Sequence, residues 1–132
     1  MRRDVLLPEE DVAYLDSLGL EWETLKESNQ EWLIVYVYSV PAGYNVDVVD
    51  IAITIPSGYP VSPLDMAYFN PGLTRTDGKS INATSHLQSL DGKSWQRWSR
   101  HRTPQNPWRP GIDSIITHFI SINHWLEREF NR

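Results

Sequence analysis

The side chains best suited to chemistry in this sequence are histidines and hydroxyls, because cysteine is absent. Its absence excludes disulfides, thiolate metal sites and a cysteine nucleophile. Imidazole is the side chain that most readily acts as a general base near neutral pH. His86 and His101 lie in the polar, irregular stretches NATSHLQ and SRHR and are the candidate bases, the alternative being hydrogen-bonded loop histidines. His118 and His124 fall on an expected helix, where surface or packing roles are more common.

A basic stretch rich in tryptophan lies between Gly92 and Ile112. It carries five basic side chains and no acidic one, interleaved with tryptophans: Lys93, Arg97, Arg100, Arg102 and Arg109, with Trp95, Trp98 and Trp108. Such a composition suits a face that binds nucleic acid or another anion. The net charge of the whole chain is −5, however, so we expect no nucleic-acid partner. The alternative is a solvated loop whose tryptophans anchor in the core beneath the arginines.

Length and charge predict one soluble domain. The 132 residues, 40% of them hydrophobic, are enough for a single core, so one domain is expected over residues 1–132. Residues 1–31 hold nine acidic and three basic side chains, so the negative charge is concentrated there. No signal-peptide core follows Arg2 and Arg3, and no apolar run reaches membrane-spanning length. We therefore expect a cytoplasmic protein that contacts no membrane.

The hydrophobic pattern predicts an α+β fold. A short helix is expected to begin at Pro8 and to end before Gly19. Four strands of an antiparallel meander are expected to follow, at residues 22–25, 32–40, 49–55 and 64–69. Apolar residues at helical spacing from Ile112 to Leu126 predict a terminal helix, with both helices on one sheet face. Residues 73–111 show neither period, and an irregular segment of that length is usually functional.

Several short motifs follow one another in the second half of the chain: GYPVSP at residues 58–63, FNPG at 69–72, DGK at 77–79 and WRPGIDSIITHF at 108–119. Their order resembles the ubiquitin-conjugating E2 fold, in which a Tyr-Pro loop follows the third strand and a Trp-x-Pro precedes a late helix. Residues 94–114, SWQRWSRHRTPQNPWRPGIDS, are similar to the bacterial group called prokaryotic E2 family E. The resemblance extends from about residue 32 to the end and implies a UBC/RWD-like fold.

The resemblance implies an E2-like carrier in a bacterial ubiquitin-like conjugation pathway. Such an acyl transferase accepts the C-terminus of a ubiquitin-like protein from an E1-like adenylating enzyme and passes it to a protein acceptor, without a cofactor or metal. E2 enzymes hold the acyl group on a cysteine, which this chain lacks. Either the protein uses a serine and forms an oxyester, or a cysteine has been replaced. The alternative is a catalytically inactive E2 variant or RWD-like module that binds a ubiquitin-like protein or an E1.

The resemblance also suggests where the nucleophile lies. Counting from the Asn-Pro-Gly turn, as the family counts from His-Pro-Asn, places it at Ser80, with Ser85 in reserve. Counting from the Asp-Gly-Lys sequence gives Ile81, which cannot react. A serine hydroxyl needs a general base within about 3 Å, and His86 or His101 is expected to supply it.

Other polar and aromatic side chains are candidates for binding the reacting groups. Asn82 or Asn70 could donate a hydrogen bond to an oxyanion. Arg100 and Arg102 are expected to bind the acidic or carbonyl-rich tail of the incoming partner. Trp98 is the aromatic candidate for the same surface, with core packing as its alternative.

Overall fold

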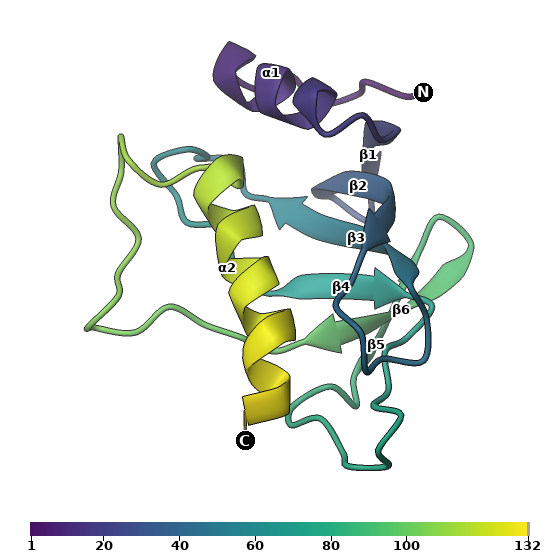
Figure 1. Cartoon of the computed structure of the whole chain (residues 1–132). Helices are drawn as coiled ribbons and strands as arrows, with labels where there is room; N and C mark the ends of the chain where they lie inside the picture. The colour runs from purple at the N-terminus through teal and green to yellow at the C-terminus, as the bar shows by residue number, and fades with distance from the viewer. Residues whose placement is uncertain (132) are drawn as a thin grey trace.

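A six-stranded antiparallel sheet forms the body of the computed structural model, which describes residues 1–131 (Figure 1). The strand order is β1-β2-β3-β4-β6-β5. The strands run as follows: β1 Trp22–Glu27, β2 Gln30–Ser39, β3 Val48–Ile55, β4 Ala67–Asn70, β5 Leu87–Leu90 and β6 Lys93–Trp98. Helix α1 (Glu9–Ser17) precedes the sheet, and helix α2 (Ile115–Arg128) follows it and continues into the short 3₁₀ helix η1 (Glu129–Asn131). An α+β fold with a helix at each end of an antiparallel sheet is thus confirmed.

The prediction of four strands is wrong, because the segment expected to be irregular contains the hairpin β5–β6. Leu90 pairs with Lys93 across a two-residue turn. The turn residues Asp91 and Gly92 both have positive φ, 54° and 75°, as a type I′ turn requires. Strand β6 also pairs with β4 and thereby extends the meander by two strands. The hydrophobic pattern does not indicate the hairpin, because most of its side chains are polar.

Helix α2 begins three residues later than the apolar spacing predicts. Ser114 accepts a hydrogen bond from the Ile116 N–H (3.1 Å), and Thr117 Oγ1 accepts one from the Ser114 N–H (2.9 Å). This reciprocal capping satisfies backbone donors that have no partner inside the helix. Ile112 therefore lies outside the helix and is exposed.

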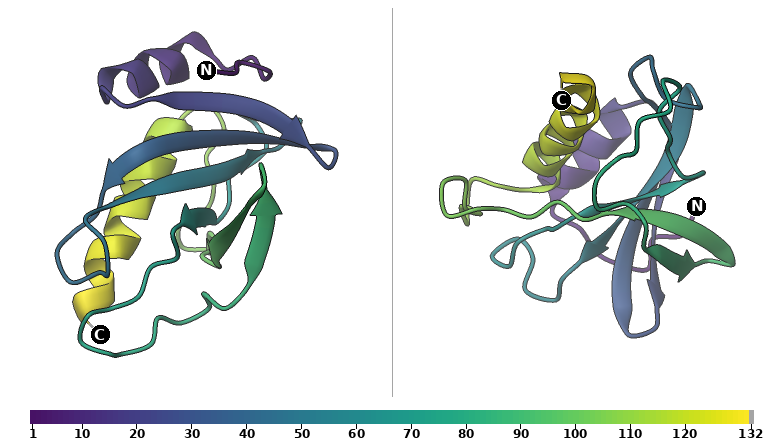
Figure 2. Two further views of the ribbon diagram at one scale, coloured as in Figure 1. Left: turned by 90° about the vertical axis from the view of Figure 1, so that its right-hand side faces the viewer. Right: turned by 90° about the horizontal axis from the view of Figure 1, so that it is seen from below.

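Both helices cover one face of the sheet (Figure 2). The main core joins Leu15 of α1 and Phe119 of α2 to the apolar side chains of that face. A smaller cluster containing Trp32, Tyr68 and Trp95 fills the other face. The strand β2 supplies both clusters, so its nearly continuous apolar run reflects burial on both sides.

The sheet curls so that its two ends approach each other. The Asp91 N–H, in the turn between β5 and β6, donates to Glu27 Oε1 at the end of β1 (3.1 Å). The Asp91 carboxylate also pairs with the guanidinium of Arg2, which lies beside β1 (2.7 Å). These polar contacts join the β5–β6 turn to the β1 end of the sheet, beside the smaller cluster.

The proline-rich loop between β3 and β4 is fastened to both helices. The Tyr59 hydroxyl donates to Asp11 Oδ2 in α1 (2.6 Å) and accepts from the Ile115 N–H at the start of α2 (2.8 Å). The Trp108 indole N–H donates to the carbonyl of Pro60 (3.0 Å). The loop therefore holds α1, α2 and the segment before α2 together. No helix within residues 1–131 is both long and apolar enough to cross a membrane.

Candidate functional site

A serine, a histidine and an aspartate form a hydrogen-bonded chain where β6 ends. The Ser99 hydroxyl lies 3.0 Å from His101 Nε2. His101 Nδ1 lies 3.1 Å from Asp65 Oδ1 and 3.0 Å from Asp65 Oδ2. A hydroxyl, an imidazole and a carboxylate in this order are the arrangement that activates serine as a nucleophile. We call these three residues the Ser99 relay.

The backbone on both sides of Ser99 is fixed by the sheet. Trp98, the last residue of β6, is completely buried and anchors the strand in the core. The Ser99 N–H donates to the Ala83 carbonyl (3.0 Å), and the Met66 N–H donates to the Arg100 carbonyl (3.2 Å). The second contact extends the pairing of β4 with β6 by one step and brings Asp65 beside His101. The relay therefore depends on contacts between distant parts of the chain.

The relay is open to solvent. The side chains of His101 and Asp65 are 59% and 43% exposed, and Ser99 is half-buried. Water screens a charge pair at such a site, so the carboxylate acts mainly by orienting the imidazole. With its proton on Nδ1, toward Asp65, the imidazole leaves the Nε2 lone pair to accept the Ser99 proton.

Two cavities flank the relay. The larger, of about 360 Å³, has an apolar wall formed by Leu64, Pro107 and Trp108 and includes Asp65 and His101. The smaller, of about 40 Å³, lies between the relay and α2; its lining includes Asp65, His101, Arg100, Arg102, His118 and Trp125. Asp65, His101 and Arg102 line both cavities, so the imidazole and carboxylate of the relay lie between an apolar hollow and a polar one.

Two polar atoms of the small cavity's lining residues are buried without a hydrogen-bond partner within residues 1–131: Arg102 Nη2 and His118 Nδ1. The other nitrogen of His118, Nε2, lies 2.8 Å from the Met66 carbonyl. That carbonyl can only accept, so Nε2 carries a proton and donates it. Burial lowers the pKa of His118 to about 4, so the ring is neutral near pH 7 and Nδ1 is an acceptor. Arg102 Nη2 is the complementary unused donor.

The predicted nucleophiles Ser80 and Ser85 lie together elsewhere. Both are exposed, and they line a separate hollow of about 350 Å³ with Lys79 and Gln96. His86 is exposed as well, and its carbonyl accepts from the Arg97 N–H (3.0 Å). The serine that the structure joins to a candidate base is Ser99, through His101.

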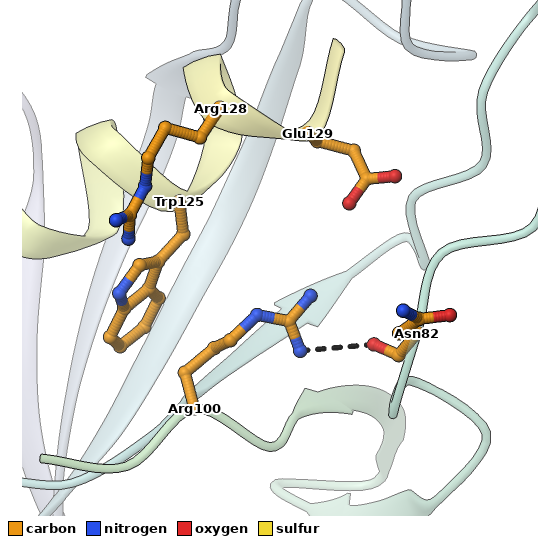
Figure 3. Close-up of a pocket in the computed structure, with 5 residues that line it drawn as sticks. All are labelled: Asn82, Arg100, Trp125, Arg128 and Glu129. Atoms are coloured by element: carbon orange, nitrogen blue, oxygen red, sulfur yellow. Dashed lines mark hydrogen bonds between the residues drawn. The ribbon is translucent and has the colours of Figure 1, made fainter. Parts of the chain in front are cut away.

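The predicted binding residues are divided between the surface and the core. Asn82 and Arg100 meet, since Arg100 Nη1 donates to the Asn82 carbonyl (3.0 Å; Figure 3). Trp98 is buried, and its ring makes a cation–π contact with Arg100, whose guanidinium carbon lies 4.8 Å from the ring centroid. Arg102 lies over Trp108 in the same way (5.0 Å).

Asn70 lies at the opposite end of the paired strands. Its amide donates to the carbonyl of Ser94 (2.9 Å), near the start of β6, whereas Ser99 follows the end of that strand. The structure therefore does not bring Asn70 to the Ser99 relay.

The sequence interpretation named His101 as a candidate base but named neither Ser99 nor Asp65. The available signal was a serine two residues before a candidate histidine, directly after a strand. Asp65 carried no comparable local signal, because it lies 36 residues from His101 in the sequence.

The model of prokaryotic E2 family E matches residues 7–129, almost the whole chain. The protein therefore belongs to this family of E2-like proteins, and the resemblance seen in residues 94–114 is confirmed. Comparisons with curated proteins and with solved structures find no match. The family suggests a role in ubiquitin-like conjugation.

Proposed function

We propose that this protein is an E2-like acyl carrier that holds the C-terminus of a ubiquitin-like protein on Ser99 as an oxyester. The observation that carries the proposal is the hydrogen-bonded chain from Ser99 through His101 to Asp65. E2-like family membership supports the conjugation role. Because cysteine is absent, an activated hydroxyl is the side chain that can take the place of the usual thiol.

The first step transfers an acyl group R–CO from a leaving group X to Ser99. X is either the thiol sulfur of an E1-like enzyme or the phosphate oxygen of an acyl adenylate. Ser99 Oγ attacks the carbonyl carbon while its proton passes to His101 Nε2. The C–X bond then breaks, X leaves with the proton, and Ser99 carries the R–CO group as an ester.

The second step moves the acyl group to an amine. The acceptor nitrogen attacks the ester carbon and loses a proton to His101. His101 returns this proton to Ser99 Oγ as the C–O bond breaks, so an amide forms and the serine is regenerated. Asp65 keeps the imidazole in the required orientation in both steps.

The tetrahedral intermediate carries a negative charge, and the nearby arginines are the candidates to stabilise it. Arg100 and Arg102 both line the small cavity beside His101. Arg102 Nη1 pairs with Asp113 Oδ2 (3.5 Å), whereas Nη2 is a buried donor without a partner among the described residues. A donor that is already dehydrated stabilises a developing oxyanion at little further cost. We assign this role to Arg102, in place of the Asn82 or Asn70 amide expected from the sequence.

The reactivity of Ser99 can be tested without its protein partners by using p-nitrophenyl acetate as the acyl donor. We expect one acetyl group per chain, mapped to Ser99 by mass spectrometry, and slower labelling in His101→Gln. Ser80→Ala and Ser85→Ala are the matched controls and should be labelled as fast as the original protein. Labelling that persists in Ser99→Ala but disappears in Ser80→Ala would identify Ser80 as the nucleophile and contradict the assignment to Ser99.

A binding module remains the second candidate, because the chain lacks the cysteine on which E2 chemistry ordinarily depends. This candidate predicts that the protein binds a ubiquitin-like protein or an E1-like enzyme with no covalent adduct. Binding measured by calorimetry, together with no acylation of any serine, would support it over the carrier.

A further inference from the structure

A hollow next to the Ser99 relay has the properties of a carboxylate-binding site (Figure 3). It has a volume of about 270 Å³ and is lined by Asn82, Arg100, Trp125, Arg128 and Glu129. Arg100 and Trp125 also line the small cavity beside His101, so the hollow and that cavity share walls. Arg100 Nη1 lies 3.3 Å from the Ser99 carbonyl. A peptide bound in the hollow would therefore lie close to the acylated serine.

The hollow combines two arginines from different parts of the fold. Arg100 follows β6 and Arg128 is the last residue of α2, and both line the hollow with Trp125. The Arg128 side chain lies beside the Trp125 indole, and the Arg100 guanidinium points toward Asn82 (Figure 3). No ion pair within residues 1–131 involves Arg128. Guanidinium groups bind carboxylates strongly through paired hydrogen bonds, and an adjacent apolar wall reduces competition from water.

Glu129, the one acidic side chain that lines the hollow, is paired with Arg75. Glu129 is buried, and its carboxylate lies 3.0 Å from Arg75 Nη1. The same Arg75 nitrogen donates to the Glu129 carbonyl (2.6 Å). Arg75 also pairs with Asp77 (2.6 Å), so it offsets the charge of Glu129 only in part. Arg75, Arg100 and Arg128 together outnumber the carboxylates of Asp77 and Glu129 by one, so this region keeps a net positive charge.

We propose that this hollow binds an acidic side chain in the C-terminal segment of the acyl donor. The inference rests on the proposed transfer to Ser99 and adds a requirement on the substrate. An extended chain advances roughly 3.3 Å per residue, so positions two to five residues before the acyl carbon cover roughly 7–17 Å from Ser99, and the test below scans this range. Arg128 thus joins Arg100 in binding the tail, whereas Arg102 serves the reacting carbonyl.

The test uses fluorescein-labelled octapeptides that end in Gly-Gly amide and carry one glutamate at the third, fourth, fifth or sixth position from the C-terminus. Glutamine peptides are the matched controls, and binding to the full chain is followed by fluorescence anisotropy at low ionic strength. We expect one glutamate position to bind about tenfold more tightly than its glutamine counterpart. Arg128→Gln should remove this preference, and Lys26→Gln, a change of an exposed cation on β1, should leave it unchanged.

Ser99→Ala separates this inference from the proposed function. The variant should keep the glutamate preference, because the hydroxyl takes no part in binding the side chain. Equal binding of all glutamate and glutamine peptides, or a preference unaffected by Arg128→Gln, would overturn the inference even if Ser99 is acylated. A preserved glutamate preference without any acylation would overturn the carrier function and leave the carboxylate site intact.

Discussion

The Tyr59 hydroxyl makes two contacts that join the proline-rich loop to both helices, so Tyr59→Phe is an incisive test of how the fold is held. The substitution removes one oxygen and leaves the ring in place. Two hydrogen bonds are lost with it: the one that the hydroxyl donates to Asp11 (2.6 Å) and the one that it accepts from the Ile115 N–H (2.8 Å). Asp11 is only 2% exposed, so water cannot easily replace the lost donor.

The expected loss of stability follows from the two contacts. A hydrogen bond to a charged group contributes about 1.5–3 kcal/mol, and a buried N–H without a partner costs about 1–3 kcal/mol. Allowing for relaxation, we expect Tyr59→Phe to reduce the free energy of unfolding by about 3 kcal/mol. Burial raises the pKa of Asp11 and the Tyr59 hydrogen bond opposes that rise, so the variant should have a still higher Asp11 pKa. A raised carboxyl pKa favours folding at low pH, so the penalty should grow as pH rises from about 4 to 7.

Urea unfolding followed by tryptophan fluorescence measures this loss. Tyr14→Phe is the matched control, because that half-buried hydroxyl makes no hydrogen bond recorded within residues 1–131, and it should change stability by less than about 0.5 kcal/mol. In an Asp11→Asn background, Tyr59→Phe should cost about 1–2 kcal/mol less than in the original chain, because no buried charge loses its donor. Equal effects of Tyr59→Phe and Tyr14→Phe would refute the reasoning.

Two further predictions concern the buried His118 and the glycine Gly43, which lies against the Phe130 ring. The pKa of His118, lowered to about 4 from its ordinary 6.5, makes the unfolded chain bind more protons between these values. Stability should therefore fall by up to about 3 kcal/mol as pH drops from 6.5 to 4, and His118→Gln should flatten this part of the profile measured by urea unfolding. Gly43→Ala should cost about 2–4 kcal/mol, because φ is +110° and the new Cβ would lie 2.7 Å from the Phe130 ring. Gly92→Ala, at φ +75° with open space around it, should cost only about 1 kcal/mol, and similar melting temperatures for the two variants would contradict the steric argument.

The sequence was sufficient to predict the elements that bury long apolar stripes. Strands β2 and β3 and helix α2 carry periodic apolar residues whose burial depends little on details elsewhere. The hairpin β5–β6 could not be found in the same way, because β5 buries only Leu90. Its stability comes from pairing with β4 and from the contacts of Asp91 with residues near the start of the chain. The Asp-Gly turn was the local signal that could have indicated it.

The candidate site likewise combines a residue that local sequence indicates with contacts between distant parts of the chain. His101 could be selected from its residue type and polar surroundings, since an exposed imidazole is suited to proton transfer whatever its exact position. Ser80 was chosen by counting along the chain, which assumes the spacing of cysteine-containing relatives. The pairing of His101 with Asp65 depends on the contact between β4 and β6 and could not be read from spacing alone.

The central claim is tested most directly by locating the covalent bond formed with a ubiquitin-like protein. The purified protein would be mixed with an E1-like enzyme and ubiquitin-like protein of its own conjugation system and ATP, and the adduct digested and mapped by mass spectrometry. We expect a single ester on Ser99, stable to thiol reductants, cleaved by hydroxylamine and absent from Ser99→Ala. An adduct mapped to any other residue, or one that still forms in Ser99→Ala, would contradict the account.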